Sequence, residues 1–478
     1  MLAVKAIKGA GWLVFSRFVG RIIDFFTLLV FARVLSPADF GLVALATSLV
    51  VVVDTMLEVP VTQALVRLPT IDKSHLDTGF TVGLLRGILI GAVILAAAWP
   101  YSLINHDSDL IMLAGVLALG PISRGLASPA MVNFARQLGF HQTFILEFLG
   151  KLTASLIAML IVLSGGAYWA IVANFVITSL VSTTASYMLA PYRPAISLKH
   201  LPDFAGFIGW YSSAQLISAL NWQFDRFLIG ALADRPTLGR YAIASDVAVI
   251  PTQSLIGPAL QPMMAAFSKI NTDRARLRHA FLKATRFAML ISTPACLGIS
   301  LTADLATDLL LGKKWEQAAP LLSLLALSMI PVPYLQTLSS VSVALGKPHV
   351  IFRLNAIDLS FRVVLISIGF YLGSVTGVSY ARIGLSAMML AFYLNETRRL
   401  LEINIAAQLR SIWKVAPAAI AMTVVVWLVR GELSGRGYPQ LVELALVIAA
   451  GAGTYAAALL LLGIRLIIGP GRLELIDR

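Results

Sequence analysis

Charged residues are scarce in this sequence. Lys, Arg, Asp and Glu make up 13% of its 478 residues, about half of what a soluble globular domain usually carries. Hydrophobic residues reach 58% and the mean hydropathy is +0.84, so the apolar side chains are too numerous for one or two soluble cores. This composition excludes an ordinary soluble enzyme and predicts an all-α polytopic membrane protein.

Other absences narrow the function further. Cys296 is the only cysteine, which excludes an internal disulfide. The six histidines lack the paired spacing of a metal site, so we expect no metal. We also expect no other cofactor and no catalytic residues. No G-x-x-x-x-G-K-[ST] phosphate loop occurs, which argues against an ATPase. The formal charge is +13, but the basic residues are not gathered in an aromatic-studded groove, and we expect no nucleic-acid partner.

Apolar runs of about 20 residues predict about 14 transmembrane helices. The first run contains Arg17, Arg21 and Asp24, and we interpret it as a membrane span rather than a cleaved signal. The runs begin near Gly9, Phe40, Gly79, Leu110, Gln142, Ala167, Ala205, Gly239, Arg286, Ala318, Val350, Gly373, Ile412 and Gln440.

The distribution of Lys and Arg predicts the orientation of these spans. With both termini in the cytoplasm, 22 of the 37 basic residues fall on the cytoplasmic side, 7 on the opposite side and 8 within spans. Because cytoplasmic loops carry an excess of Lys and Arg, both termini are predicted to be cytoplasmic.

An internal repeat appears at an offset of 198 residues. It pairs spans 1 to 6 with spans 7 to 12, and because six is even, the two halves share one orientation about a pseudo-two-fold axis. We therefore expect a six-helix lobe at 1–190, a cytoplasmic linker at 191–204, a second lobe at 205–395 and two further helices at 396–478. The matching residues are Gly41, Ala44, Ala46, Val51, Leu57, Pro60 and Gln63, which recur as Gly239, Ala242, Ala244, Val249, Leu255, Pro258 and Gln261.

Four short motifs occur in a recognisable order. They are the stretches Leu35 to Ala46 (LSPADFGLVALA), Asp225 to Gly230 (DRFLIG), Leu311 to Leu322 (LGKKWEQAAPLL) and Ala344 to Pro348 (ALGKP). Together they resemble the polysaccharide transporter family of the multidrug/oligosaccharidyl-lipid/polysaccharide (MOP) flippase superfamily, over roughly residues 9–395.

This resemblance implies a flippase that moves polyprenyl-diphosphate-linked oligosaccharides across the bacterial inner membrane, for exopolysaccharide, capsule or O-antigen assembly. It also implies membrane lipids, H⁺ or Na⁺, and glycan polymerase or export machinery as partners. One alternative is a cation-coupled multidrug antiporter of the same superfamily. Another is a membrane glycan polymerase or ligase, which the short external gaps disfavour.

Charged residues within the spans supply the candidate site, because a charge in the bilayer is costly unless it meets an anion, a partner or water. Arginine forks bind phosphate oxygens, so we expect substrate contacts from six of the intramembrane arginines. These are Arg17, Arg21, Arg86, Arg124, Arg226 and Arg362. For ion coupling the candidate carboxylates are Asp24, Asp54, Glu58 and Asp358.

Two local patterns remain open at this stage. Arg17, Arg21 and Asp24 share one helix face, which either lines a cavity or merely holds an intrahelical Arg–Asp pair. Pro121 and Pro331 interrupt corresponding spans of the two halves and are either hinges for alternating access or packing features.

A strip of glycines also runs along the third span. Gly79, Gly83, Gly87 and Gly91 recur at every fourth residue, which places them on one helix face. Small residues in such a strip let two helix backbones approach closely, so the strip predicts close packing against a neighbouring helix.

Overall fold

The computed structural model describes residues 2–477 apart from positions 60, 69, 138, 140, 257–262, 265, 434, 435, 437, 470 and 471. At positions 2–14, 63, 67, 203–214, 254, 255 and 465–477 only the backbone is described. The chain divides into two compact units, residues 1–242 and 243–478. Apart from one short C-terminal hairpin, every regular element described is helical, as the composition predicts.

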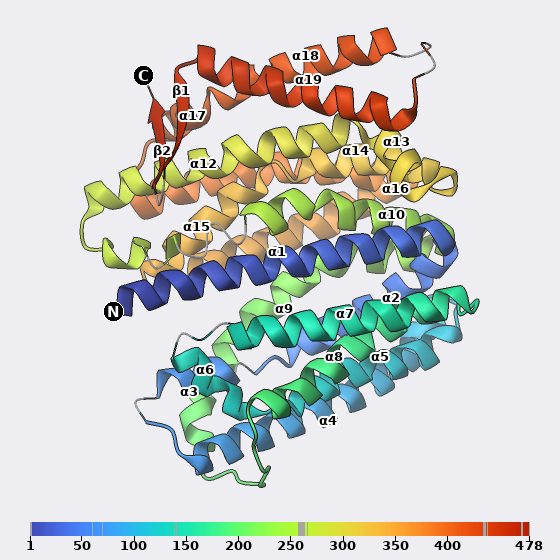
Figure 1. The fold of residues 1–478 in the computed structure, drawn as a ribbon, viewed down its shortest axis with the longest axis vertical. Helices are drawn as coiled ribbons and strands as arrows, with labels where there is room; N and C mark the ends of the chain where they lie inside the picture. Colours follow the sequence, from blue (N-terminus) through green and yellow to red (C-terminus); the bar gives the residue numbers. More distant parts are fainter. Residues whose placement is uncertain are drawn as a thin grey trace. The chain divides into compact units, whose positions relative to one another are not determined.

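The first unit is built entirely from helices in its described part (Figure 1). The last of them, α10, continues past the boundary between the units. The elements are α1 (Leu2–Val34), α2 (Pro37–Met56), α3 (Val61–Arg67), α4 (Lys73–Ile104), α5 (Asp109–Gly125), a 3₁₀ turn (Pro129–Met131), α6 (Val132–Arg136), α7 (His141–Leu163), α8 (Trp169–Leu189), α9 (Leu201–Leu232) and α10 (Arg235–Ala248).

The second unit contains the remaining helices and a two-stranded antiparallel hairpin. Its helices are α12 (Arg274–Leu301), α13 (Ala303–Ala306), α14 (Ala319–Ser328), α15 (Val332–Ala344), α16 (His349–Leu401), α17 (Ile405–Ile412), α18 (Val415–Leu433) and α19 (Gln440–Leu461). Two π-helical turns (Pro251–Ile256 and Thr307–Leu311), a 3₁₀ turn (Lys313–Ala318) and the strands β1 (Ile464–Gly469) and β2 (Arg472–Asp477) complete it.

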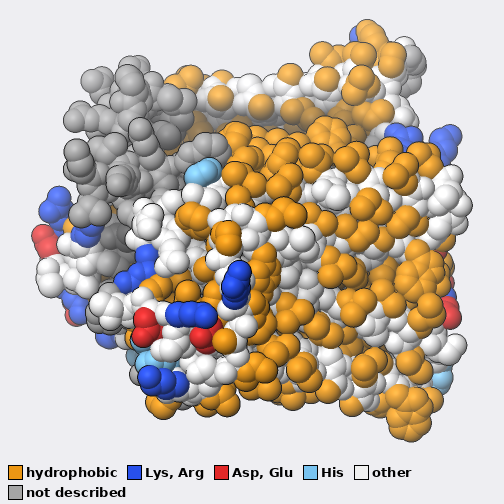
Figure 2. Space-filling model, turned by 60° about the horizontal axis from the view of Figure 1, so that its bottom comes forward, with side chains coloured by type: hydrophobic (Ala, Val, Ile, Leu, Met, Phe, Trp, Pro, Cys, Tyr) orange, Lys and Arg blue, Asp and Glu red, His pale blue; other side chains and the backbone are white. Residues whose placement is uncertain are grey.

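Nine helices in the described residues are long and apolar enough to cross a membrane, and a bent pair, α5 with the segment Pro129–Arg136, makes up to ten. This establishes a multi-pass membrane protein. The count of 14 stays a prediction, although each expected start falls within or beside a described helix. Figure 2 shows one face covered mostly by hydrophobic side chains, as contact with lipid requires, with charged side chains in its lower left part and at its right edge.

The 53-residue α16 is two helices joined at a break. Gly373 and Ser374 have non-helical backbone angles, with φ of −151° and 52°. An added Cβ at Gly369 would overlap the carbonyl oxygen of Gly377, and one at Gly377 would overlap that of Gly369. Residues eight apart in a straight helix are separated by about 12 Å. The chain therefore bends sharply here, at the glycine where the sequence predicts a new span.

Helix α2 begins at a capping box. The hydroxyl of Ser36 accepts a hydrogen bond from the Asp39 backbone N–H (3.2 Å), and the Asp39 carboxylate accepts one from the Ser36 backbone N–H (2.9 Å). Pro37 occupies the first turn, where its missing N–H costs nothing. The Leu35-Ser36-Pro37-Ala38-Asp39 stretch is thus a helix-start signal.

The glycine strip of α4 packs against α5. An added Cβ at Gly83 would overlap the carbonyl oxygen of Gly125, and one at Gly125 would overlap that of Gly83. At Gly87 the nearest atom would be the Ile122 carbonyl oxygen, at 3.2 Å. The predicted close helix packing is confirmed here.

Repeat-related positions contact each other where α2 and α10 begin. An added Cβ at Gly41 would overlap the Arg235 carbonyl oxygen, and one at Gly239 would overlap the Pro37 carbonyl oxygen. Gly41 and Gly239 are separated by the 198-residue offset, and so are Pro37 and Arg235. The two pairs of repeat-related positions therefore contact each other reciprocally. Three of the other repeat positions, Pro60, Pro258 and Gln261, lie outside the described residues.

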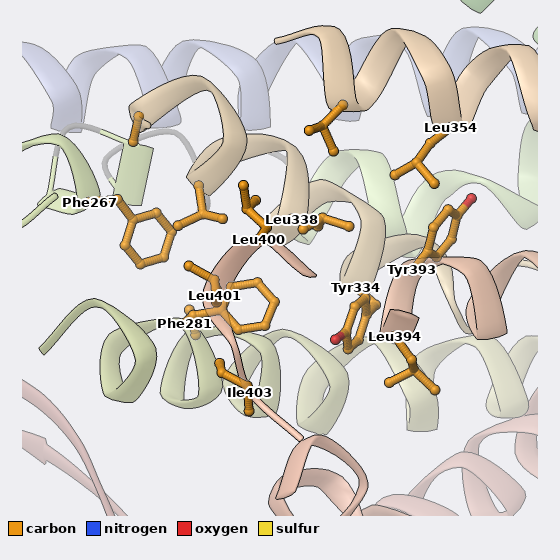
Figure 3. Close-up of a cluster of buried hydrophobic side chains, with 14 of the residues drawn as sticks. Phe267, Phe281, Tyr334, Leu338, Leu354, Tyr393, Leu394, Leu400, Leu401 and Ile403 are labelled. Carbon is orange, nitrogen blue, oxygen red and sulfur yellow. The ribbon is translucent and has the colours of Figure 1, made fainter. Parts of the chain in front are cut away.

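The second unit has its own apolar core (Figure 3). Phe281 packs edge-to-face against Tyr334 with ring centroids 5.9 Å apart, and both side chains are almost fully buried. The Tyr334 hydroxyl donates to Gln408, at 2.5 Å, which satisfies its polar end inside the core. In the LGKKW motif, Gly312 has a φ of 98° and Trp315 is fully buried.

Candidate functional site

Two arginines clamp one carboxylate in the first unit. Asp54, near the end of α2, accepts hydrogen bonds from Arg86 of α4 on Oδ1 and from Arg124 of α5 on Oδ2, each at 2.6 Å. Three of the expected site residues therefore meet, from three helices. The formal charges of these three residues sum to +1, and Glu58, one turn beyond Asp54, brings the sum to zero.

Arg86 is held by the backbone of α2 as well as by Asp54. Its Nε donates to the carbonyl oxygen of Leu57 at 2.8 Å, and its Nη2 donates to that of Asp54 at 3.0 Å. These carbonyls lie at the C-terminal end of α2, where the helix dipole favours a cation. Only 15% of the Arg86 side chain is exposed. Arg86 is therefore placed to fix the end of α2 and the orientation of Asp54.

Arg124 is the accessible member of the Asp54 site. Its Nη1 donates to the Ser179 hydroxyl of α8 at 2.9 Å, and its guanidinium carbon lies 5.8 Å from the centre of the Phe175 ring. These contacts leave N–H donors of the five-donor guanidinium for another acceptor. Arg124 is therefore oriented by α8, and 41% of its side chain is exposed. A ligand can reach its guanidinium group.

Glu58 lies one turn beyond Asp54 and meets a different helix. Its Oε2 accepts a hydrogen bond from the Gln215 side chain of α9 at 3.4 Å. Two carboxylates cannot neutralise each other, and the structure supplies each of them with a partner from another helix.

The α1 candidates are arranged differently. Asp24 accepts a hydrogen bond from Lys151 of α7 at 2.6 Å, and Lys151 also donates to the Gly20 carbonyl oxygen at 3.4 Å. The side chains of Arg17 and Arg21 are exposed. Lys151 is a basic residue within a predicted span, but nothing in the sequence spacing indicates that α7 supplies the partner of Asp24.

The remaining candidates lie away from Asp54 along the chain. Arg226 is a half-buried residue of α9, next to Asp225, which accepts a hydrogen bond from the Tyr241 hydroxyl at 2.7 Å. In the second unit, Asp358 and Arg362 lie one turn apart on α16 and form an ion pair of 3.1 Å. Asp24, Asp54 and Asp358 thus each have a basic partner.

The two candidate hinge prolines occupy different kinds of position. Pro121 lies inside α5, which continues without a break to Gly125, and the 55° bend follows before the segment that starts at Pro129. Pro331 stands at the start of α15, where α14 and α15 are interrupted. A hinge role remains a prediction for both.

A family model described as "Polysaccharide biosynthesis protein" matches residues 30–320, a range that contains the Asp54 site. The chain belongs to this family. Among curated relatives, it is 24% identical over 329 residues to the succinoglycan biosynthesis transport protein ExoT of Rhizobium meliloti, covering 68% of this chain and 66% of the relative. It is 23% identical over 465 residues to the teichuronic acid biosynthesis protein TuaB of Bacillus subtilis, covering 96% and 95%.

Solved structures show that this family member has the fold of the MOP superfamily. The lipid II flippase MurJ in an inward closed conformation matches with a TM-score of 0.73 at 14% identity, covering 95% of this chain and 98% of MurJ. An inward-facing multidrug resistance MATE transporter matches with a TM-score of 0.62 at 15% identity, covering 81% and 95%.

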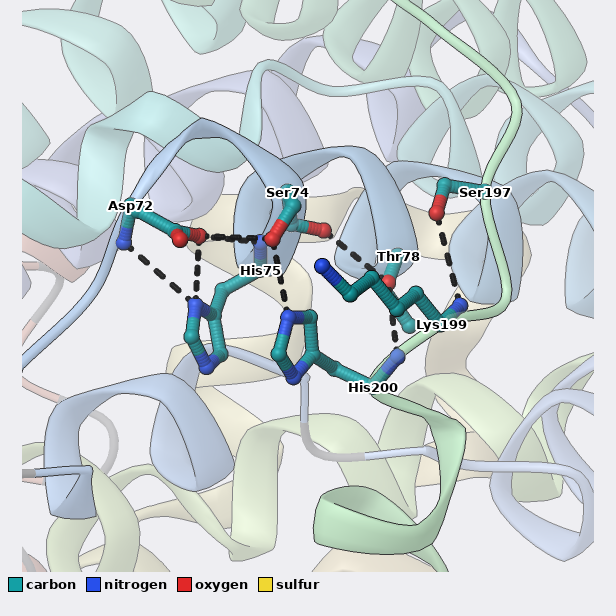
Figure 4. A network of polar contacts seen from close by, with 7 residues as sticks. All are labelled: Asp72, Ser74, His75, Thr78, Ser197, Lys199 and His200. Atoms are coloured by element: carbon teal, nitrogen blue, oxygen red, sulfur yellow. Dashed lines mark hydrogen bonds and ion pairs between the residues drawn. The ribbon is translucent and has the colours of Figure 1, made fainter.

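A cluster of polar side chains at the start of α4 was not predicted from the sequence (Figure 4). His75 Nδ1 lies 2.6 Å from Asp72 Oδ1, and the His75 ring stacks on that of His200 with centroids 3.7 Å apart. The hydrogen bonds of the His75 backbone N–H and ring hold the pKa of the Asp72 carboxyl well below its usual range. The two histidines are 125 residues apart in the sequence. The only sequence feature that relates them is that both are predicted to lie on the same side of the membrane.

Proposed function

We propose that this protein moves a polyprenyl-diphosphate-linked oligosaccharide across the bacterial inner membrane by alternating access. The observation that carries the proposal is the Asp54 site, where Arg124 is both oriented and exposed. Membership of the polysaccharide biosynthesis family supports a glycan precursor as cargo. A diphosphate matches the forked N–H donors of arginine, and its negative charge is attracted to the guanidinium group of Arg124.

In this mechanism the diphosphate competes with Asp54 for Arg124. The approaching phosphate oxygens accept hydrogen bonds from the outward N–H groups of Arg124, while Ser179 and Phe175 hold the guanidinium plane. Arg86 remains bonded to the end of α2 and acts as a positioning residue. Arg17 and Arg21 on α1 offer further exposed charge. The lipid tail stays in the bilayer.

The test is transport in proteoliposomes that contain a polyprenyl-diphosphate-linked oligosaccharide. The wild-type protein is expected to move the glycan to the opposite leaflet, which an impermeant glycan-cleaving enzyme detects. Arg124→Gln should lower the initial rate by at least about tenfold, since one charge-assisted hydrogen bond contributes about 1.5–3 kcal/mol. Arg124→Lys keeps the charge but loses the fork, and it should also transport slowly.

Arg436→Gln is the matched control. Arg436 forms an ion pair with Glu432 one turn away at 2.6 Å, on an exposed surface. Its loss removes an arginine and a salt bridge without touching the Asp54 site, so transport should stay at the wild-type rate. Normal transport by Arg124→Gln contradicts the assignment of the site. Efflux of a cationic dye with no glycan movement would instead indicate the multidrug antiporter.

We further propose that Asp54 couples transport to an ion gradient. A proton or Na⁺ that neutralises Asp54 weakens its hold on Arg124 and makes that arginine available to the diphosphate. In the double variant Asp54→Asn, Glu58→Gln, transport should lose its dependence on an imposed gradient. A gradient dependence that persists in this variant rules out coupling through the pair.

A further inference from the structure

The expected linker between the lobes is fastened to the first turns of α4. Residues 191–200 have no regular helix or strand. The Tyr192 hydroxyl donates to the Asp77 carboxylate, and the Ser197 backbone N–H donates to Thr81 Oγ1 at 2.9 Å. At the end of the linker, the His200 backbone N–H donates to Thr78 Oγ1 at 3.3 Å (Figure 4). This segment therefore follows the α4 surface.

The last of these contacts brings a set of metal donors together. One ligand atom each from Asp72, His75 and His200 lies within 4.8 Å of the other two. Two imidazole nitrogens and one carboxylate oxygen are donors that divalent transition metals accept, and Zn²⁺ combines them with a water in a tetrahedral site. Neither an N-cap nor a ring stack requires all three donors to converge.

We propose that Asp72, His75 and His200 form a binding site for a divalent transition metal, with Zn²⁺ as the best match, and that the metal fastens the linker to α4. His75 and Asp72 belong to the start of α4, whereas His200 belongs to the linker. A bound ion therefore joins two segments that are 125 residues apart. The proposal does not depend on the transported substrate.

Only small movements separate the observed contacts from a coordinated ion. A tetrahedral zinc with ligands at about 2.1 Å spaces its donors by about 3.4 Å. The His75 to Asp72 distance of 2.6 Å must therefore open. The Asp72 side chain is 66% exposed and has room to turn outward. His200 must exchange its 2.8 Å hydrogen bond with the Ser74 hydroxyl for the metal. Such a hydrogen bond has a modest net strength.

The test uses the full chain purified in detergent without a histidine tag. Equilibrium dialysis against ZnCl₂, followed by elemental analysis, should find one Zn²⁺ per chain. His75→Gln and His200→Gln should each weaken binding by at least about tenfold, because each removes one of three protein ligands. Ser74→Ala removes a competing hydrogen bond but no ligand, and it should retain the ion.

His141→Gln is the matched control, because it removes an exposed histidine at the start of α7. It should bind like the wild type. Hydrogen exchange supplies the second measurement: Zn²⁺ should slow amide exchange within 191–200, and this effect should vanish in the His75→Gln, His200→Gln double variant. Zinc content equal in the wild type and double variant overturns the site. Zinc binding without slower exchange in 191–200 overturns the fastening of the linker.

Discussion

Asp24 and Lys151 show what a single charge contributes inside the first unit. Their side chains are 44% and 27% exposed and lie 2.6 Å apart, joining α1 to α7. Lys151→Gln leaves the carboxylate without this partner, and we expect a loss of about 1–2 kcal/mol of stability, more than for a surface pair. Thermal unfolding in detergent measures the change. The double variant Asp24→Asn, Lys151→Gln should regain part of the loss, whereas purely additive losses contradict the pairing.

Ser36 supports a second prediction for one residue. Its hydroxyl caps α2, and Ser36→Ala should destabilise the protein by about 1 kcal/mol. Ser108→Ala is the matched control, because Ser108 stands at the same position before α5 but makes no side-chain cap hydrogen bond. The difference between the two variants in unfolding temperature isolates the cap. Equal shifts contradict its importance.

Helix packing makes Gly83 a sensitive position. Gly83→Ala should separate α4 from α5 and cost about 1–3 kcal/mol, because the new methyl group would overlap the Gly125 carbonyl oxygen. Gly453→Ala is the matched control in α19, since an added Cβ there meets no atom within 4 Å. It should be neutral or slightly stabilising through helix propensity. Unfolding temperatures of the two variants in one detergent decide the comparison.

The helices were more predictable from sequence than their partners. Apolar length places a span on the chain, and the strip at Gly79 to Gly91 marks the face of α4 that packs closely, so these features follow from local pattern. The choice of Lys151 for Asp24, or of two arginines for Asp54, depends on how each helix is rotated toward its neighbours. Local periodicity carries no information about that rotation.

The loops were less predictable for a related reason. A proline removes a donor, but neighbouring groups decide whether the helix breaks there, so α5 continues through Pro121 and bends only after Gly125. Glycines were better guides, because Gly373 marks the break in α16. His75 and His200 meet only because residues 191–200 return along α4, a path that no spacing rule describes.

At the scale of the whole molecule, topology is the prediction to test. Cys296 is the only cysteine of the sequence and is buried. The Cys296→Ala variant therefore contains no cysteine, and single cysteines can be introduced into it for labelling. A cysteine at Ser108 should react with an impermeant thiol reagent from outside intact cells, whereas one at Thr272 should react only after lysis. Both side chains are exposed. Reporter tags at both termini should indicate the cytoplasm, and a periplasmic C-terminus contradicts the even number of spans.

The reciprocal contact of Gly41 and Gly239 has a mechanical meaning. A point on a rotation axis stays in place while more distant points travel along arcs. For the alternating access proposed above, we therefore expect the crossing of α2 and α10 to act as the pivot, with displacements that grow with distance from it. At Gly41 and Gly239 the two backbones approach each other directly, with no side chain between them that could change its conformation. We therefore expect the contact to resist deformation.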